Sequence, residues 1–266
     1  MHATLGSMSL PTIEFRYRVS APLEDWVIPE GTVPESIPHS SCTQHIEALL
    51  SFWAARAGRP LFVARNLAVR WLESHPAVGI DPDVCLLDPP PPEVESLSSL
   101  RLWIAGHVPP PLAFEVVSAS HPYKDYVGIQ ERYATIGTRE LVVFDPLLHG
   151  PKSLGGPVLF QLWRRDTDDL FQRVYAGPGP VFCEALEAWL GEEGGRLRIS
   201  RDRAGRDRWL TEAEHERVEK ERERAEKERE RAEKEQVRAE KERERAARLE
   251  VEQRLAALEG ALRERS

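Results

Sequence analysis

The last quarter of this 266-residue chain restricts its fold most, because it repeats a charged unit of seven residues. From Arg217 onward the units read Arg-Val-Glu-Lys-Glu-Arg-Glu, Arg-Ala-Glu-Lys-Glu-Arg-Glu, Arg-Ala-Glu-Lys-Glu-Gln-Val and Arg-Ala-Glu-Lys-Glu-Arg-Glu. These residues are strong helix formers. Glu223 with Lys227 and Glu230 with Lys234 add i, i+4 pairs in the favourable orientation, each contributing ~0.2–0.5 kcal/mol. The segment therefore predicts a solvent-exposed helix.

This helix offers a partner little apolar surface until its end. The same single position is apolar in every heptad: Val218, Ala225, Ala232, Ala239 and Ala246. Alanine at a single seam position buries too little surface to drive tight pairing. A seam with spacing four, three, four follows at Val251, Leu255, Leu258 and Leu262. We expect a charged helix over residues 209–264 that ends in a short coiled coil. Self-association through this seam is favoured, and a solvated spacer or an unrelated partner remain alternatives.

The rest of the chain has the composition of one globular domain. The first ~195 residues carry nearly all the aromatic, proline and β-branched residues, which predicts a domain over residues 15–195. Cys42, Cys85 and Cys183 form no Cys-x-x-Cys pair and are interpreted as reduced core residues. The N-terminus has no basic region followed by an apolar region, and no apolar run approaches ~18 residues. We expect a soluble, cytoplasmic protein without a membrane span.

The formal net charge of −8 lies mostly on the globular part, because acids and bases nearly balance in the repeat. This distribution argues against a broad basic face of the kind that binds DNA non-specifically. A local basic cleft can exist on an acidic protein, so nucleic-acid binding remains open.

Apolar periodicity predicts an α/β or α+β domain with a mixed sheet. The predicted helices cover residues 40–57, 122–136 and 183–190, and the predicted strands cover residues 61–72, 84–87, 112–117, 141–144, 158–163 and 170–175. In the second helix Tyr126, Ile129, Tyr133 and Ile136 share one face, and Gly137 is expected to end it.

Two acidic residues stand out against this pattern. Asp83 directly precedes the predicted strand at residues 84–87, and Glu115 lies inside the apolar strand at residues 112–117. A carboxylate in a buried strand is costly unless it is paired or binds a metal. Two carboxylates on neighbouring strands suit Mg²⁺, which can activate water and stabilise charge on a phosphodiester. The alternatives are an arginine pair for Glu115 and ordinary turn chemistry for Asp83.

Other polar residues of the domain give weaker signals. His39 and His45 have no partner at metal-like spacing, and His45 is interpreted as a polar surface or capping residue. Lys124 and Asp125 are interpreted as an exposed pair.

The order and spacing of several motifs resemble the Uma-two family of restriction endonucleases, within the PD-(D/E)XK nuclease superfamily. The residues that carry this resemblance are Pro82-Asp83-Val84, Phe114-Glu115-Val116-Val117-Ser118, Asp125, Tyr133, Gly137, Glu140 and Asp145-Pro146. The resemblance covers about residues 15–190, and charged helical tails also occur in longer members. It implies a restriction-endonuclease-like core, a mixed sheet flanked by helices, that hydrolyses phosphodiester bonds of DNA with a divalent metal. By position, Asp83 and Glu115 become the catalytic ligands of Mg²⁺ or Mn²⁺, and Glu35 is a weaker candidate for an auxiliary acid.

The chain departs from this resemblance where a catalytic lysine is usual. The position four residues before Tyr133 is Ile129, and the position two residues after Glu115 is Val117. On a continuous helix Lys124 would point well away from the Ile129 face. Since a cation that stabilises the transition state is worth orders of magnitude in rate, its absence is a serious loss.

Three functions are therefore compatible with the sequence. The first is a metal-dependent DNA endonuclease. The second is a catalytically degenerate nuclease fold that serves as a binding or assembly module and oligomerises through its coiled coil. The third is a protein that acts chiefly through the coiled coil.

Overall fold

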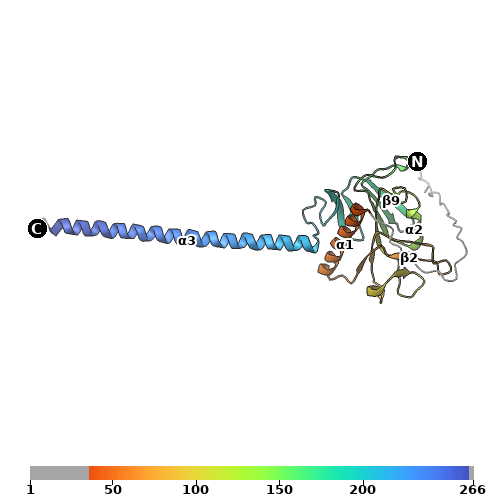
Figure 1. Ribbon diagram of the computed structural model, residues 1–266, viewed down its shortest axis with the longest axis horizontal. Helices are drawn as coiled ribbons and strands as arrows, with labels where there is room; N and C mark the ends of the chain where they lie inside the picture. Colours follow the sequence, from red (N-terminus) through yellow and green to blue (C-terminus); the bar gives the residue numbers. More distant parts are fainter. Residues whose placement is uncertain (1–35, 264–266) are drawn as a thin grey trace, which may run out of the picture. The chain divides into compact units, whose positions relative to one another are not determined.

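The computed structural model describes residues 36–263, without the side chains of residue 95 and of residues 255–263 (Figure 1). The chain divides into two compact units, Met1–Trp209 and Leu210–Ser266. The helices of the first unit are α1 (Ile37–Ala57) and α2 (Ile129–Ile136), with short 3-10 turns at Val94–Ser96 and Lys152–Leu154. Its strands are β1 (Phe62–Arg65), β2 (Ala68–Arg70), β3 (Gly79–Ile80), β4 (Val84–Leu87), β5 (Ser99–Arg101), β6 (Leu112–Val116), β7 (Glu140–Phe144), β8 (Phe160–Arg165), β9 (Phe171–Gly177), β10 (Val181–Cys183), β11 (Ala188–Glu193) and β12 (Arg196–Ser200).

A six-stranded mixed sheet forms the centre of this unit, as the sequence predicts. Its order is β1-β4-β6-β7-β8-β9, and β6 and β7 run parallel while the other neighbours are antiparallel. Two smaller sheets accompany it, one of β10-β11-β12 and one of β3-β2-β5. The unit therefore has the α/β class expected. The predicted strand at residues 61–72 divides between β1 of the central sheet and β2 of a smaller sheet.

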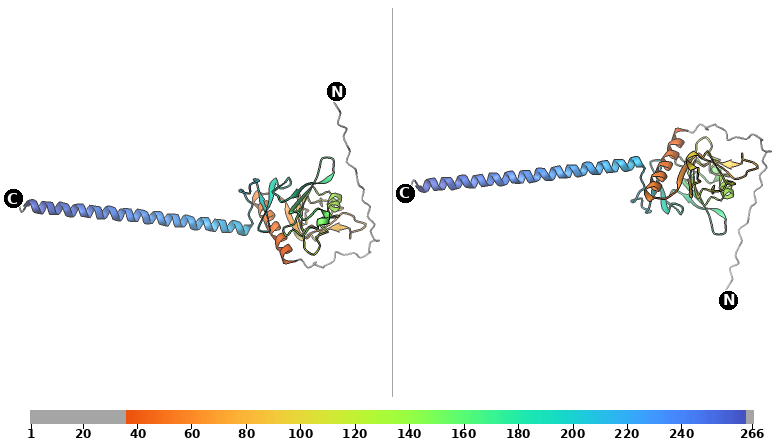
Figure 2. Two further views of the ribbon diagram at one scale, coloured as in Figure 1. Left: turned by 90° about the horizontal axis from the view of Figure 1, so that it is seen from above. Right: turned by 90° about the horizontal axis from the view of Figure 1, so that it is seen from below.

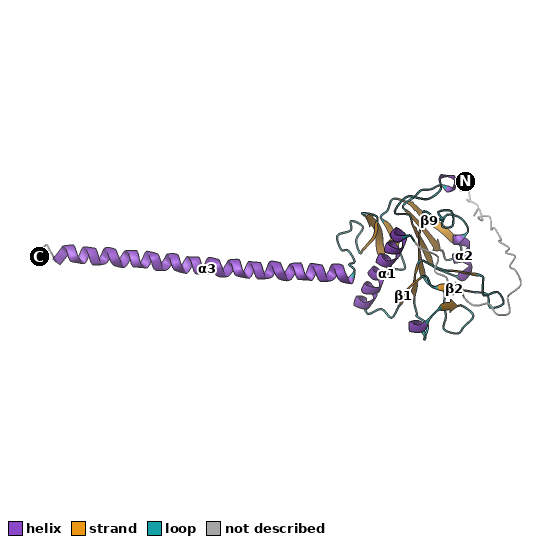
Figure 3. Cartoon of the chain, in the orientation of Figure 1, coloured by secondary structure: helices purple, strands orange, loops and turns teal. Residues whose placement is uncertain are grey.

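Helices cover both faces of the central sheet (Figure 3). Successive side chains of a strand point to opposite faces, so β6 contributes to two separate cores. Phe114 and Val116 pack in the core that contains the buried face of α1, whereas Ala113 and Val117 pack in the core that contains α2. By the same alternation Glu115 lies on the α2 side.

The first helix confirms the expected helix at residues 40–57 but begins at Ile37. Ser36 is the N-cap and its hydroxyl accepts a hydrogen bond from the backbone N–H of His39, while Pro38 lies in the first turn. Gly58 ends the helix with a φ of 62°, in the left-handed region that favours glycine. These caps bring His39 into the first turn of α1.

The predicted helix at residues 183–190 is wrong. The segment forms part of the β10–β11 hairpin instead, with Cys183, Ala188 and Leu190 buried in the core. The buried carboxylate of Glu140 on β7 accepts hydrogen bonds from the backbone N–H groups of Glu184 and Ala185, at 3.2 Å and 2.6 Å. This long-range acceptor holds the turn, and it overrides the helix propensity of the segment.

The first unit extends past the expected boundary at residue 195. β12 follows that position and pairs with β11. Trp209 is buried, stacks on Trp53 of α1 with ring centroids 4.4 Å apart, and donates its backbone N–H to the carbonyl of Ile199. The three cysteines of this unit are buried and free, in agreement with their interpretation as core residues.

The second unit is one continuous helix, α3 (Glu212–Arg263), in both views of Figure 2. Its 52 residues span ~78 Å at 1.5 Å per residue. The helix begins with a capping box: Thr211 Oγ1 accepts from the N–H of Glu214, and the Glu214 carboxylate accepts from the N–H of Thr211. In the described part of the chain, no helix has an apolar stretch long enough to cross a bilayer.

The charged repeat forms the ion pairs that its spacing predicts. The ammonium of Lys227 lies 3.7 Å from Glu223, and that of Lys234 lies 3.5 Å from Glu230. The leucine seam at residues 255–262 lies beyond the described side chains, so the coiled coil stays a prediction.

Candidate active site

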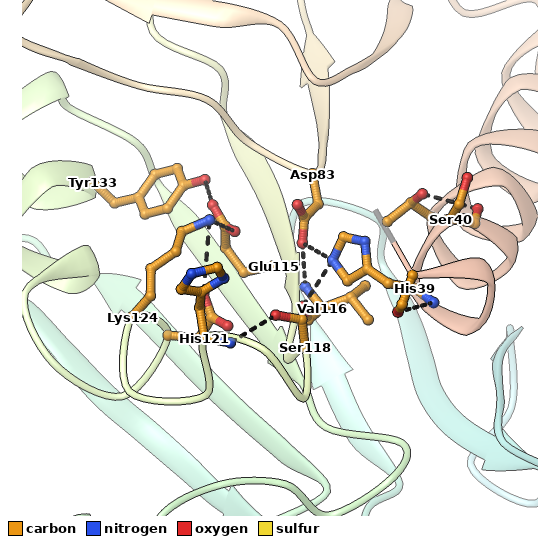
Figure 4. Close-up of polar contacts among 12 residues, drawn as sticks. His39, Ser40, Asp83, Glu115, Val116, Ser118, His121, Lys124 and Tyr133 are labelled. Atoms are coloured by element: carbon orange, nitrogen blue, oxygen red, sulfur yellow. Dashed lines mark hydrogen bonds and ion pairs between the residues drawn. The ribbon is translucent and has the colours of Figure 1, made fainter. Parts of the chain in front are cut away.

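The two acids singled out by the sequence lie opposite each other at the end of the β4–β6 ladder. The antiparallel register pairs Val84 with Phe114. One step further along the same register places Asp83 opposite Glu115. Directly opposed residues of antiparallel neighbours have their side chains on one face of the sheet. The two acids therefore lie near each other at the end of this ladder (Figure 4), and the charge of Asp83 acts on Glu115.

Asp83 is fixed by contacts from two elements that are distant in sequence. Its Oδ2 accepts a hydrogen bond of 2.7 Å from the backbone N–H of Val116. The same oxygen lies 3.1 Å from Nε2 of His39, which also lies 3.0 Å from the carbonyl oxygen of Val116. Because both neighbours of Nε2 are acceptors, this nitrogen carries the ring hydrogen and donates. No local pattern in the sequence links His39 to Asp83, because the two residues lie 44 positions apart.

Glu115 is fully buried and has a partner at each carboxylate oxygen. Its Oε1 accepts a 2.5 Å hydrogen bond from the hydroxyl of Tyr133, and its Oε2 lies 3.4 Å from Nζ of Lys124. Burial raises the pKa of Glu115 well above its ordinary value, and the negative charge of Asp83 raises it further. The partner is thus a lysine rather than the arginine considered from sequence.

Lys124 reaches this carboxylate because the helix predicted at residues 122–136 begins only at Ile129. Residues 122–128 form consecutive turns, and Gly128 has a φ of 83°, which an α-helix cannot contain. Lys124 is therefore free of the helical geometry that would turn it away. The interpretation of Lys124 and Asp125 as an exposed pair is wrong for Asp125, which is buried, whereas the Lys124 side chain is half exposed and lies 4.0 Å from it. The carboxylate of Glu115 raises the pKa of Lys124, so the ammonium is charged at neutral pH.

Asp125 joins the same cluster as a third buried carboxyl group. Burial raises its pKa to about 7, against the opposing effect of the Lys124 charge. Its Oδ1 is buried without a hydrogen-bond partner among the described residues, and it lies 4.0 Å from Nζ of Lys124. A buried acceptor without a donor indicates a site that another cation or water could complete.

The positions where the family usually has a lysine supply no cation. Ile129 and Val117 are buried in the core on the α2 side. Glu35, the weaker candidate for an auxiliary acid, lies outside the described residues.

The donor atoms at this site suit a hard divalent cation. Within residues 36–263 no group of three or more His, Cys, Asp and Glu side chains is arranged to hold a metal ion. Mg²⁺, however, keeps several waters and binds through one or two protein carboxylates. Asp83 and Glu115 supply two such groups, the Val116 carbonyl lies beside them, and Asp125 Oδ1 has no donor of its own among the described residues. The all-oxygen set therefore fits Mg²⁺ or Mn²⁺.

A mixed sheet with helices on both faces, and buried acids beside a lysine, define a restriction-endonuclease-like α/β protein. Residues 18–174 match the family Uma2, described as "Putative restriction endonuclease". The match covers more than half of the chain, which therefore belongs to this family.

Comparison with other known proteins adds little detail. A putative nuclease belonging to DUF820 from Anabaena variabilis, solved by crystallography, is 13% identical, with a TM-score of 0.41 over 61% of this chain and 80% of that one. Among curated proteins no significant match was found.

Proposed function

We propose that this protein is a metal-dependent endonuclease that hydrolyses phosphodiester bonds of DNA. One observation carries the proposal: a lysine ammonium lies 3.4 Å from a fully buried glutamate that stands opposite a second buried acid. Two carboxylates and a cation at one point are what phosphodiester hydrolysis requires, because the reaction needs an activated water and develops negative charge on the phosphate. Membership of the Uma2 family supports the same reaction class.

Each residue of the cluster has a role that its contacts support. Asp83 and Glu115 would hold Mg²⁺ or Mn²⁺, which supplies a water of lowered pKa and neutralises phosphate charge when bound. His39 and the backbone N–H of Val116 orient Asp83, while Tyr133 orients Glu115. Lys124 donates from the solvent side, since its side chain is 53% exposed, and it stabilises charge on the scissile phosphate.

A second candidate is a degenerate nuclease fold that binds or assembles without cleaving. Buried Ile129 and Val117 at the usual lysine positions favour it. Lys124 counts against it, because a cation reaches the acids from a different element.

The full-length chain should nick supercoiled plasmid DNA in the presence of Mg²⁺ or Mn²⁺. A chelator should stop cleavage, and re-addition of the metal should restore it, since both acids need the cation to act. A Glu115→Gln variant purified in the same way controls for contaminating nucleases and should leave the plasmid intact. Equal nicking by this variant, or no nicking by the wild type with either metal, would remove the hydrolase proposal.

Self-association through the end of α3 belongs to this proposal, because two joined copies would present two sites to the two DNA strands. Light scattering of the full-length chain should then give a mass of at least twice 30.2 kDa. A monomer mass at micromolar concentration would exclude it.

A further inference from the structure

The loop at residues 122–128 carries Lys124 and Asp125 and is held by turn hydrogen bonds, such as that from the N–H of Val127 to the carbonyl of Tyr123, instead of a continuous helical ladder. Its one deeply anchored aromatic side chain among the described residues is Tyr126, which is 9% exposed and packs in the α2-side core. The hydroxyl of Tyr126 lies 3.1 Å from Oδ2 of Asp145 and accepts a hydrogen bond of 3.1 Å from the backbone N–H of Val158. The loop is therefore attached through this hydroxyl, and also through the side-chain amide of Gln130, which donates to the carbonyl of Asp125 at 3.1 Å.

Asp145 is a rigid acceptor for that hydroxyl. It is fully buried directly after β7, the parallel neighbour of the strand that carries Glu115. Its Oδ1 accepts from the N–H of His149 and its Oδ2 from the N–H of Gly150, both at 2.8 Å. These backbone donors hold the carboxylate in place. Tyr126 and Asp145 thus connect the loop to the strand ends at the active site.

The chain leaves room for the Tyr126 ring at two glycines. A Cβ added at Gly150 would lie 2.2 Å from the Tyr126 hydroxyl oxygen, and one at Gly156 would lie 2.7 Å from its ring. Real Cβ atoms essentially never approach so closely. The Tyr126 ring can therefore occupy this position only because Gly150 and Gly156 have no side chains. The backbone at these two glycines lies against the ring on two sides.

We propose that Tyr126 and Asp145 form a latch that positions Lys124 against Glu115. Among the described residues, the hydroxyl of Tyr126 bonds to Asp145 and Val158 and not to Asp83 or Glu115, so Tyr126 is a positioning residue that acts through the lysine two residues before it. The inference rests on the proposed function, in which Lys124 stabilises charge on the phosphate. Misplacement of a reacting group by about 1 Å can cost on the order of 10²-fold in rate, so a hydroxyl outside the chemistry can matter.

Removal of the hydroxyl with Tyr126→Phe should lower kcat for metal-dependent cleavage by roughly 10-fold with little change in KM. The matched control is Tyr123→Phe, which removes a hydroxyl from the same loop where the side chain is 62% exposed. That control should cleave like the wild type. Circular dichroism and the thermal midpoint would verify that both variants are folded.

A double-mutant cycle separates a latch from a general structural effect. In a Lys124→Met background, Tyr126→Phe should cause no further loss of kcat, because the group that it positions is gone. An equal loss in both backgrounds would overturn the inference, and so would wild-type activity of Tyr126→Phe alone.

Amine labelling of the metal-free protein tests the latch without any cleavage. The rate at which a small acylating reagent modifies Lys124, followed by mass spectrometry, should rise in Tyr126→Phe, while that of exposed Lys152 stays constant. An unchanged rate at Lys124 would overturn the inference. If the wild type cleaves no DNA, the proposed function fails, but the labelling still decides whether the latch holds Lys124.

Discussion

Replacement of Lys124 with methionine should lower the rate of metal-dependent cleavage by about 10²–10³-fold, the loss typical when one preorganised electrostatic group is removed. Methionine keeps an unbranched apolar stem of similar length and removes only the ammonium. Tyr133 still donates to Glu115 in this variant, so one of the two contacts of that carboxylate remains. The fold should therefore survive, and the defect should lie in kcat.

The structure offers both a control and a rescue for this variant. Lys152→Met removes an exposed lysine from the same unit and should leave the cleavage rate unchanged. Ile129→Lys places a lysine on α2 at the position usual for the family, and in the Lys124→Met background it should restore part of the rate. Both would be measured by initial rates of plasmid nicking at saturating Mg²⁺. Wild-type rates for Lys124→Met would show that the loop supplies no catalytic cation.

Replacement of Asp125 with asparagine should flatten the dependence of stability on pH. Burial raises the pKa of Asp125 from 3.8 to about 7, so the folded state holds this proton more tightly than the unfolded state. The unfolded chain therefore loses the proton first as the pH rises. The wild type should lose stability between about pH 4 and pH 7, by on the order of 4 kcal/mol for this shift.

The asparagine variant cannot ionise at this position, so it should lack this loss and exceed the wild type in stability at pH 8. Urea unfolding at pH 5 and pH 8, with a chelator present, measures the difference. Asp168→Asn changes an exposed acid and should follow the wild type at both pH values. A wild-type slope retained in Asp125→Asn would contradict the prediction. Part of the slope should persist in any case, because burial also raises the pKa of Glu115.

Both predictions concern the same balance between the activity of the site and the stability of the fold. The cluster places three carboxyl groups in a buried position with one lysine, although isolated buried charges are costly. Such a cluster lowers the stability of the metal-free fold, and it is the arrangement that a divalent cation can complete. Activity and stability should therefore respond in opposite directions to changes at these acids.

Local patterns in the sequence determined much of this protein. The seven-residue repeat specified α3, because its helix propensity and its i, i+4 pairs act within a single helix. The apolar run interrupted by Glu115, and the acid directly before the strand at residues 84–87, pointed to both members of the acid pair. Their opposed positions needed only the β4–β6 register for completion.

Only the tertiary structure decided the contacts that complete the site. His39 meets Asp83 through the packing of α1, and the segment at residues 183–190 became a hairpin because Glu140 holds its turn. Lys124, although half exposed, becomes the partner of Glu115 because Gly128 delays the start of α2. The physical reason is the same in each case: propensity and periodicity report interactions between near neighbours. A buried carboxylate, in contrast, takes its partner from whichever distant segment the fold brings within hydrogen-bond reach.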